Sequence, residues 1–314
     1  MNIALIILNW NGKKDTLECL DSIAKLDYEK FETIVVDNGS TDGSLDSLPT
    51  HVTVLKNKEN LGFAEGNNVG IRYALEKDFD AVVLLNNDTI VDPQFLSAFA
   101  RADKPIQGAL IYLYQERDRL DHLGGTWNPR TASFDFTCLR AKEIPEELSL
   151  DYLCGCALFV RRGVFETIGL LESKFFLIWE ESDFCFRAKR AGFPLHVCRE
   201  ALVWHKVSAS FTGGKPHSTY FWWRNRLLWI ERNCTRPQKV SLYLRVLLPE
   251  IFHLYKLFAI KSLFPSKNKK EKLLQYRAAL TGIHHYICRR FGNGPAWIYK
   301  KKPMRSGTGT KEGL

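Results

Sequence analysis

Two short apolar runs in the first hundred residues each lead to an aspartate, and this pattern constrains the fold more than any other feature. Ile-Val-Val is followed at once by Asp37, and Ala-Val-Val-Leu-Leu by two asparagines and Asp88. Helical patterns at 13–26 and 64–77 separate these strand-like runs. Strands that alternate with helices predict a mostly parallel α/β sheet with helices on both faces. Ligands bind beyond the carboxyl ends of such strands, so we expect Asp37 and Asp88 at one edge.

The residues around both aspartates are polar. The loop after Asp37 is Asn-Gly-Ser-Thr-Asp-Gly-Ser, which is typical of tight turns. It lacks the spaced glutamate of a calcium loop and the GK[ST] of a Walker loop. A carboxylate that hydrogen-bonds a ribose or a base is one interpretation of Asp37, and a turn-closing Asx motif is the other.

Asn86 and Asp88 alternate along a segment that we expect to be extended, which would place both side chains on one side. A carboxylate and a carboxamide oxygen there suit a hard divalent cation shared with phosphates. A simple turn is the alternative interpretation of this segment.

The second half of the chain has less regular patterns. Residues 105–160 are irregular and rich in aromatic residues, which predicts an inserted sheet or loops. A helix at 180–192, two short strands at 194–205 and an aromatic helix at 218–232 are expected to follow.

Several motifs occur in one order along the chain: VVDNGSTDGS, NLGFAEGNNVGIRYAL, LLNNDT, the block from CGCALF to RAKRAGF, VWHKVSAS and YFWWRNRLLWI. This ordered set covers residues 3–231 and resembles the family-two glycosyltransferases of the GT-A fold, in particular their bacterial rhamnosyltransferase-like branch. The resemblance implies a Rossmann-like, mostly parallel mixed sheet in a catalytic domain at 1–234. Within it we expect a nucleotide-sugar half at 1–104 and an acceptor half at 105–234.

The resemblance also implies roles on the donor side. Asp37 would contact the nucleobase or ribose, and Asp88 would bind a divalent cation, Mn²⁺ or Mg²⁺. His205 matches a distal metal ligand, although a core histidine at a strand end is the alternative, and Asn86 stands where many relatives carry a first acid. The other expected donor-binding residues are Asn9, Asn38, Ser40, Asn60, Gly62, Asn67, Asn68, Asn86 and Asn87.

Three acids lie at the expected start of the 180–192 helix, where capping is one interpretation. The resemblance implies that Glu181 is the catalytic base that takes the proton of the acceptor hydroxyl. Asp183 is assigned to the same catalytic motif, to hold the helix or the acceptor, and its spacing to Arg187 suits an ion pair. Because a helix N-terminus favours anions, we expect a depressed pKa for Glu181. Further candidates for acceptor or phosphate contacts are Trp179, Glu180 and Arg224, the last of which is alternatively an aromatic-packed surface arginine.

Together these roles describe an inverting, metal-dependent glycosyltransferase. It would move rhamnose or another hexose from a nucleotide-diphosphate sugar to a saccharide or lipid-linked saccharide in the synthesis of surface polysaccharide or glycolipid. A non-catalytic sugar-nucleotide or lipid-binding scaffold is the alternative, because Asn86 leaves the metal site short of an acid. A dinucleotide-dependent oxidoreductase is disfavoured because no G-x-G-x-x-G follows the first strand.

The last eighty residues carry the positive charge of the chain. From Thr235 onward there are 17 lysines and arginines against 3 aspartates and glutamates, whereas the first 234 residues have 27 against 32. The segment 240–264 is too interrupted by charges to span a membrane comfortably, but its His253, Lys256 and Lys261 fall on one arc of a helix. We expect 235–314 to be a basic amphipathic helical extension that lies on an anionic membrane surface. Docking of this helix on the catalytic body is the alternative.

Composition also bears on nucleic-acid binding, on the cysteines and on the location of the protein. Nucleic acid is disfavoured because the aromatic residues of the extension segregate with leucines. The first residues lack a basic leader and a cleavage site, and the eight cysteines form no CxxC pair. We therefore expect reduced thiols and a cytoplasmic protein, peripheral on the inner face of a bacterial plasma membrane, where an undecaprenyl-type acceptor would be available.

Overall fold

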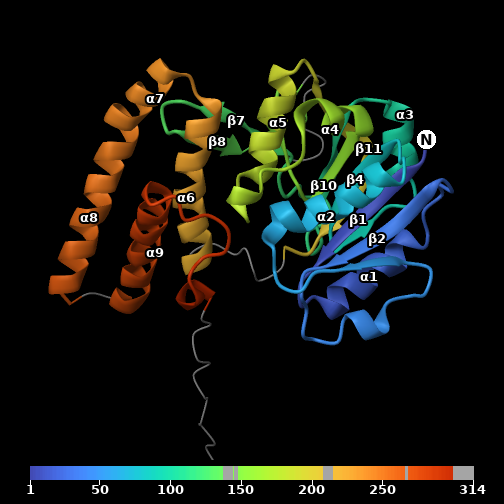
Figure 1. Ribbon diagram of the computed structural model, residues 1–314, viewed down its shortest axis with the longest axis horizontal. Coiled ribbons are helices and arrows are strands. Elements are labelled where there is room, and N and C mark those ends of the chain that lie inside the picture. Colours follow the sequence, from blue (N-terminus) through green and yellow to red (C-terminus); the bar gives the residue numbers. More distant parts are fainter. Residues whose placement is uncertain (137–143, 145–147, 208–214, 266–267, 300–314) are drawn as a thin grey trace, which may run out of the picture.

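The computed structural model describes residues 1–136, 144, 148–207, 215–265 and 268–299. Within these ranges the main sheet has the strand order β3-β2-β1-β4-β10-β6-β11-β5 (Figure 1). Its strands are β1 (Ile3–Asn9), β2 (Phe31–Asp37), β3 (Thr53–Lys56), β4 (Ala81–Asn86), β5 (Thr89–Val91), β6 (Ile106–Leu113), β10 (Ala157–Arg161) and β11 (Leu195–His205).

The main sheet is mixed, as predicted. β3, β2, β1 and β4 are parallel neighbours, whereas β10 runs antiparallel to β4 and β6, and β5 runs antiparallel to β11. Asn9 is in register with Asp37, and Leu8 with Asn86, so the carboxyl ends of β1, β2 and β4 meet at one edge. Asp88 follows β4 by two residues. The structure therefore confirms that the two aspartates lie at one edge of the sheet.

Helices cover both faces of the sheet because the central strands are apolar on both sides. Ile3, Leu5 and Ile7 of β1 belong to one core cluster, with side chains of α1 and α3, and Ala4 and Ile6 belong to the other, with side chains of α2, α4 and α5. A strand buried on both faces reads as a continuous apolar run, which is the pattern seen in the sequence. The helices are α1 (Lys13–Ile23), α2 (Gly62–Glu76), α3 (Phe95–Ala102), α4 (Arg162–Ile168) and α5 (Glu180–Arg190), with 3₁₀ turns η1 (Leu45–Ser47) and η3 (Ser173–Phe175).

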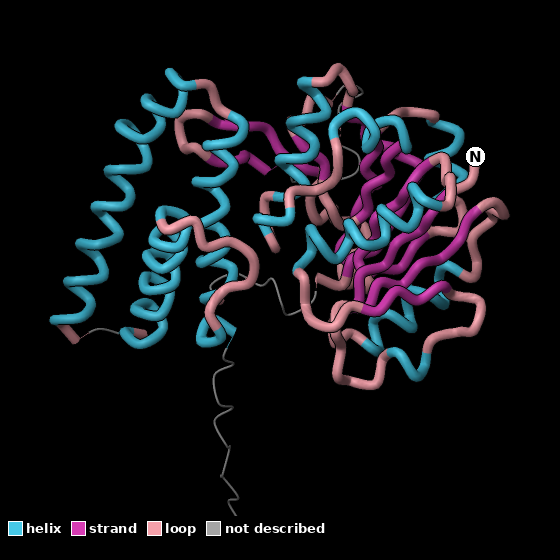
Figure 2. The backbone as a smooth tube through the Cα atoms, in the orientation of Figure 1, coloured by secondary structure: helices cyan, strands magenta, loops and turns pink. Residues whose placement is uncertain are grey.

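A small antiparallel sheet lies between the main sheet and the C-terminal helices (Figure 2). It consists of β8 (Ser133–Phe136), β7 (Gly124–Asn128) and β9 (Tyr152–Leu153), and it confirms the inserted sheet that was expected within 105–160. The ring of Trp127 on β7 lies 4.3 Å from that of Trp229, which joins this sheet to the helical layer.

The stretch 194–205 forms one long strand where two short ones were expected. Both of its parts pair with β6 in the parallel direction, and the register shifts between Cys198 and Leu202. Arg199 and Glu200, which lie between the two paired parts, therefore belong to an irregularity inside β11. The continuous strand carries His205 to the carboxyl edge of the sheet.

The C-terminal helices pack on the body formed by the preceding described residues. Leu242, Leu254 and Ile283 share one core cluster with Trp229, and α9 packs against both α6 and α8 (Figure 1). The predicted alternative of docking on the body therefore holds for the inner faces of these helices. No helix in the described residues is long and apolar enough to cross a membrane. The elements are α6 (Pro216–Asn233), α7 (Arg236–Leu242), a π-helical turn (Tyr243–Leu247), α8 (Leu248–Leu263), α9 (Lys269–Ile287) and η5 (Ala296–Tyr299).

Candidate active site

Asn9 and Asp37, side by side at the ends of β1 and β2, form the centre of a buried polar cluster. Asn9 Nδ2 donates to Asp37 Oδ1 (3.0 Å) and to Ser44 Oγ (2.9 Å), and Asn9 Oδ1 accepts from Thr16 Oγ1 (2.9 Å). The amide of Ser40 donates to Asp37 Oδ2 (3.1 Å), which is the turn-closing bond of the alternative interpretation. These bonds fix the carboxylate, and each of its oxygens keeps a lone pair for another donor.

Asn38, Asn60 and Gly62 shape the loop that leads into α2. Asn38 Oδ1 accepts from the Leu61 amide (3.1 Å), and its Nδ2 donates to the Gly62 carbonyl (3.0 Å). Asn60 Oδ1 accepts from the Gly62 amide (2.8 Å). Gly62 has a φ of +81°, and a Cβ there would lie 2.4 Å from the carbonyl oxygen of Phe176, so a larger residue does not fit.

Asn67 and Asn68 on α2 are buried, and their amides bond to the backbone. Asn67 Nδ2 donates to the carbonyl of Phe63 (2.9 Å). Asn68 donates to the Leu171 carbonyl (2.9 Å) and accepts from the Leu171 amide (3.1 Å), which joins α2 to the segment before α5. The geometry thus gives these two residues a structural role and provides no support for the expected direct contact with a donor.

The residues after β4 form a turn, so the expectation of an extended segment there is wrong. Asn87 and Asp88 are the turn residues between β4 and β5, and Thr89 Oγ1 donates to the Asn86 carbonyl (2.6 Å). Asn86 and Asp88 are therefore not alternate residues of one strand. Asn87 Nδ2 donates to Thr16 Oγ1 (3.0 Å), which attaches the turn to the polar cluster at the end of β1.

Pairing of β11 with β5 brings His205 to Asp88. His205 is opposite Thr89, the residue after Asp88, in the antiparallel register. His205 Nε2 lies 3.2 Å from Asp88 Oδ1, and His205 Nδ1 lies 2.9 Å from Asp121 Oδ2. Burial lowers the pKa of His205, but Cys156 and the two carboxylates outweigh it and raise that pKa above its ordinary value. The two residues expected to bind a metal are therefore adjacent, and we call them the Asp88–His205 pair.

Asp121 is a site residue that the sequence analysis missed. It precedes His205 by 84 residues, and no local motif marks it. Its amide donates to the Ile111 carbonyl (2.8 Å) on β6, the parallel neighbour of β11. Burial opposes ionisation of this carboxyl, but its bonds to His122 and His205 hold the pKa of Asp121 well below its usual range. A carboxylate that accepts from Nδ1–H orients the imidazole and leaves Nε2 as a ligand.

The backbone before α5 is left-handed at three bulky residues. Phe176, Ile178 and Trp179 have φ values of +63°, +71° and +82°, a region that such side chains rarely adopt. Asn225 on α6 holds this segment, because its Nδ2 lies 2.8 Å from each of three of the segment's carbonyl oxygens, which share its two N–H groups. Strain of this kind persists only where the surroundings fix it, and here it sets where α5 begins.

The strained segment is followed directly by two glutamates, each of which has a carboxylate oxygen without a hydrogen-bond partner among the described residues. Glu180 is buried and Glu181 is partly exposed. Glu180 Oε2, Glu181 Oε2 and Trp179 Nε1 are all buried without a hydrogen-bond partner among the described residues. Burial, together with the Glu181 carboxylate, raises the pKa of Glu180 well above its ordinary value. Burial likewise raises the pKa of Glu181, so the expected depression by the helix N-terminus is wrong.

Glu181 borders the same region as the Asp88–His205 pair. A Cβ on Gly155 would lie 3.4 Å from the Cβ of Glu181, so these two residues are in contact. The next residue, Cys156, contacts His205, and its carbonyl accepts from the amide of the last residue of β4 (2.9 Å). The fold therefore brings the acid of α5 to the carboxyl edge of the sheet.

Comparison with known proteins identifies the family. The model of Glycosyl transferase family 2 matches residues 4–169, which is more than half of the chain. The chain belongs to glycosyl transferase family 2. It is 22% identical over 257 residues to the dTDP-rhamnosyl transferase RfbF of Shigella flexneri, covering 74% of this chain and 81% of that protein. It is 26% identical over 260 residues to the N-acetylglucosaminyl-diphospho-decaprenol L-rhamnosyltransferase of Mycobacterium tuberculosis, covering 68% of this chain and 83% of that protein.

A solved structure confirms the fold of this family-2 glycosyltransferase. The mannosyltransferase PcManGT from Pyrobaculum calidifontis, solved in complex with GDP-Man and Mn²⁺, matches with a TM-score of 0.54 at 15% identity. The match covers 92% of this chain and 88% of that one. The fold is GT-A, as the sequence motifs indicated.

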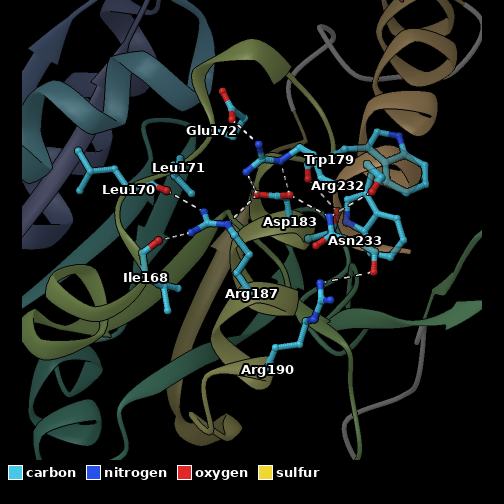
Figure 3. A network of polar contacts seen from close by, with 12 residues as sticks. Ile168, Leu170, Leu171, Glu172, Trp179, Asp183, Arg187, Arg190, Arg232 and Asn233 are labelled. Atoms are coloured by element: carbon cyan, nitrogen blue, oxygen red, sulfur yellow. Dashed lines mark hydrogen bonds and ion pairs between the residues drawn. The ribbon is translucent and has the colours of Figure 1, made fainter. Parts of the chain in front are cut away.

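Asp183 of this glycosyltransferase lies at the centre of a buried ion-pair network (Figure 3). Arg187 Nε donates to its Oδ2 (2.9 Å), and Arg232 Nε (2.9 Å) and Asn233 Nδ2 (2.8 Å) donate to its Oδ1. The expected ion pair with Arg187 is confirmed. Because the carboxylate is fully buried and bonded to three donors, its position fits the expected role of holding the helix, and the geometry gives no support to contact with the acceptor.

Arg224 is fully buried on α6, which corrects both expectations for it. Its Nη2 donates to the Phe175 carbonyl (2.8 Å), its Nη1 to the Gly292 carbonyl (2.6 Å), and its guanidinium stacks 4.8 Å from the ring centre of Phe221. It is packed against aromatic residues, but it lies in the core, where it cannot meet a phosphate. With Asn225, it holds the strained segment before α5.

Proposed function

We propose that this family-2 member is an inverting, metal-dependent glycosyltransferase that transfers a hexose from a nucleotide-diphosphate sugar. The observation that carries the proposal is the buried, unpartnered Oε2 of Glu181, whose neighbour Gly155 precedes Cys156, the residue that contacts His205. Buried polar groups are almost always hydrogen-bonded, so an unpartnered carboxylate oxygen near the carboxyl edge of the sheet indicates that a bound ligand supplies the missing hydrogen bond. A hydroxyl of a sugar acceptor has the donor that would satisfy it.

Asp88 and His205 are the residues that would hold the cation. Their carboxylate oxygen and imidazole nitrogen suit Mn²⁺ or Mg²⁺, and Asp121 orients the imidazole. The described residues contain no group of three or more protein ligands placed to hold a metal ion, so the remaining positions would fall to diphosphate oxygens and water. Such an ion offsets the negative charge that develops on a leaving diphosphate.

Glu181 is the proposed general base. Inversion by a single displacement needs the acceptor hydroxyl to attack as the diphosphate leaves, and its proton then passes to the Glu181 carboxylate. The raised pKa of Glu181 makes it a stronger base than an ordinary glutamate and suits this role. Asp183 is proposed to act through position alone, because its network fixes the first turn of α5. Asp37 and Asn9 remain the proposed contacts for the nucleoside.

The names of the relatives support a finer proposal for the substrates. RfbF is named as a dTDP-rhamnosyl transferase, and the mycobacterial relative as one that acts on a diphospho-decaprenol acceptor. We therefore place rhamnose first among candidate sugars and a lipid-linked saccharide first among candidate acceptors. The work of the enzyme would lie in surface polysaccharide or glycolipid synthesis at the inner face of a bacterial plasma membrane.

The test combines thermal shift with turnover. A panel of nucleotide sugars, each with and without Mn²⁺, should contain one that raises the melting temperature only with the ion, because a ligand at a hundredfold excess over its Kd stabilises by about 2.7 kcal/mol. Asp88→Ala should lose the Mn²⁺-dependent shift and release of nucleoside diphosphate, whereas Glu181→Gln should keep the shift and lose the release. Glu116→Gln, at an exposed acid, is the control.

Two results would contradict the proposal. The first is binding of a nucleotide sugar without transfer of its sugar to any saccharide or lipid-linked acceptor. That result would favour the non-catalytic scaffold, which the small number of protein metal ligands among the described residues also favours. Near wild-type transfer by Glu181→Gln would remove that residue from the role of base.

A further inference from the structure

We propose that the outer face of α7 and α8 docks on an anionic lipid surface. Six large apolar side chains along these helices are exposed, with exposed fractions between 52% and 76%. We call them the outer stripe: Val240, Leu244, Leu248, Phe252, Tyr255 and Leu263. Contiguous exposed apolar patches on a soluble protein mark interaction sites, whereas scattered single residues do not.

The stripe is continuous because α7 and α8 join through the π-helical turn. Val240, Leu244, Leu248 and Phe252 recur every four residues across that turn. On α8, at the helical repeat, the four residues of the stripe fall within an arc of about 80°. Figure 1 shows α8 as the outermost helix of the molecule, on the far side of α9 from the sheet.

A second side of α8 already has its partners. Leu254 is buried and Ile251 packs against the same core cluster, so the inner face is accounted for by the contacts with α9. α8 is therefore apolar on two sides, and folding of the described residues covers only one of them. From the sequence we expected one apolar face and one polar arc on this helix, whereas in the structure the apolar residues occupy two separate faces.

Basic residues border the stripe at both ends. A shallow depression on α7 is lined by Arg236, Pro237, Val240, Ser241, Leu244 and Arg245, so two arginines flank apolar side chains there. At the other end, Lys269, Lys270 and Lys272 open α9 just beyond Leu263, with one acid, Glu271, among them. Glu250, the one acid of α8, is paired with Arg226 at 2.6 Å.

Basic residues beside an exposed apolar stripe indicate which kind of partner binds the outer face of α7 and α8. Apolar side chains bordered by lysines and arginines fit the acyl region and the anionic headgroups of a bilayer at the same time. A second copy of the chain would bring the same basic borders together and would meet repulsion. The inference deepens the proposed location at a membrane, but it rests on exposed residues of α7 and α8 and not on the catalytic assignments.

The experiment is co-sedimentation of the full chain with vesicles. We expect binding to vesicles of mixed phosphatidylcholine and phosphatidylglycerol, weakened by high salt, and little binding to phosphatidylcholine alone. The double variant Phe252→Ser/Leu263→Ser should partition about tenfold or more weakly, because two exposed side chains no longer enter the bilayer. Arg236→Glu/Arg245→Glu should lose the preference for anionic lipid.

Matched controls lie on other surfaces of the molecule. Phe136→Ser removes an exposed aromatic ring from β8, and Lys14→Glu reverses an exposed charge on α1. Neither variant should change binding to vesicles. Failure of the full chain to bind anionic vesicles would overturn the inference, as would equal binding by the stripe variant. So would a dimer in light scattering that Phe252→Ser/Leu263→Ser dissociates, since the stripe would then be an interface between copies. No sugar nucleotide is needed, so this outcome is independent of the catalytic tests.

Discussion

Asp183→Asn and Glu181→Gln should have opposite effects on stability, although the two acids lie two residues apart on α5. Asp183 is fully buried and ion-paired with Arg187 and Arg232, whose side chains are 20% and 29% exposed. Breaking a buried pair costs about 3–5 kcal/mol. We take the lower end, about 3 kcal/mol, because both arginines keep some solvent and other acceptors, among them Glu172. The melting temperature of Asp183→Asn should therefore fall by about 5 °C, since the entropy of unfolding grows with chain length.

Glu181→Gln should not destabilise the fold, and above neutral pH it should stabilise it. Folding raises the pKa of Glu181 above its ordinary value of 4.5. A group of this kind favours folding below its unfolded pKa, and that contribution is lost as the pH rises through the folded pKa. The glutamine variant has no such loss, so its advantage over wild type should grow from pH 4 to pH 8.

Calorimetry at several pH values, alongside turnover, measures both effects. Asp21→Asn, at an exposed acid of α1, is the control for removing one carboxylate. Expected results are a destabilised Asp183→Asn whose residual folded fraction still turns over, and a stable Glu181→Gln that does not. Wild-type melting of Asp183→Asn with abolished turnover would refute the reasoning, because Asp183 would then contact the reacting groups.

Two further predictions concern the rate. Because the base must be ionised, kcat/KM should fall as the pH falls through the raised pKa of Glu181. The midpoint of the acid limb of the pH–rate profile should therefore lie above 4.5. A midpoint at or below that value would contradict the assignment of Glu181 as the base. Asn225→Ala should lower kcat about 10- to 100-fold with little change in KM for the donor, because the side-chain amide that contacts three carbonyls before α5 is lost. An unchanged kcat in the folded variant would show that these contacts do not position the base.

Local patterns were sufficient to predict the strands and helices of about the first ninety residues. Apolar runs that end in polar residues specify strands, and parallel pairing brings their carboxyl ends together without any knowledge of side-chain contacts. Asn9, Asp37 and Asp88 are found at the predicted edge for this reason. The ordered motifs then supplied His205, which β11 delivers next to Asp88.

The rest of the site depends on contacts that no local pattern encodes. Asp121 reaches His205 from 84 residues away, and only the parallel pairing of β6 with β11 brings them together. Arg224 and Asn225 are charged and polar residues in an aromatic helix, and the sequence offers no sign that they bind carbonyls of the segment before α5. Sequence reasoning placed Arg224 at the surface because a buried arginine needs acceptors that only the fold reveals.

The two acids of α5 show where the local rule for helix termini stops applying. Both Glu181 and Asp183 occupy the first turn, where the helix dipole favours a carboxylate by a few tenths of a kcal/mol to about 1 kcal/mol. Desolvation of an unpaired carboxylate costs more than this, so the pKa of Glu181 rises although the dipole acts against it. Asp183 is buried more deeply, yet two arginines and an asparagine compensate it. The fold thus stabilises one acid fully and leaves its neighbour unsatisfied, and an acid held in that state by a strained, clamped segment is the one suited to accept a proton.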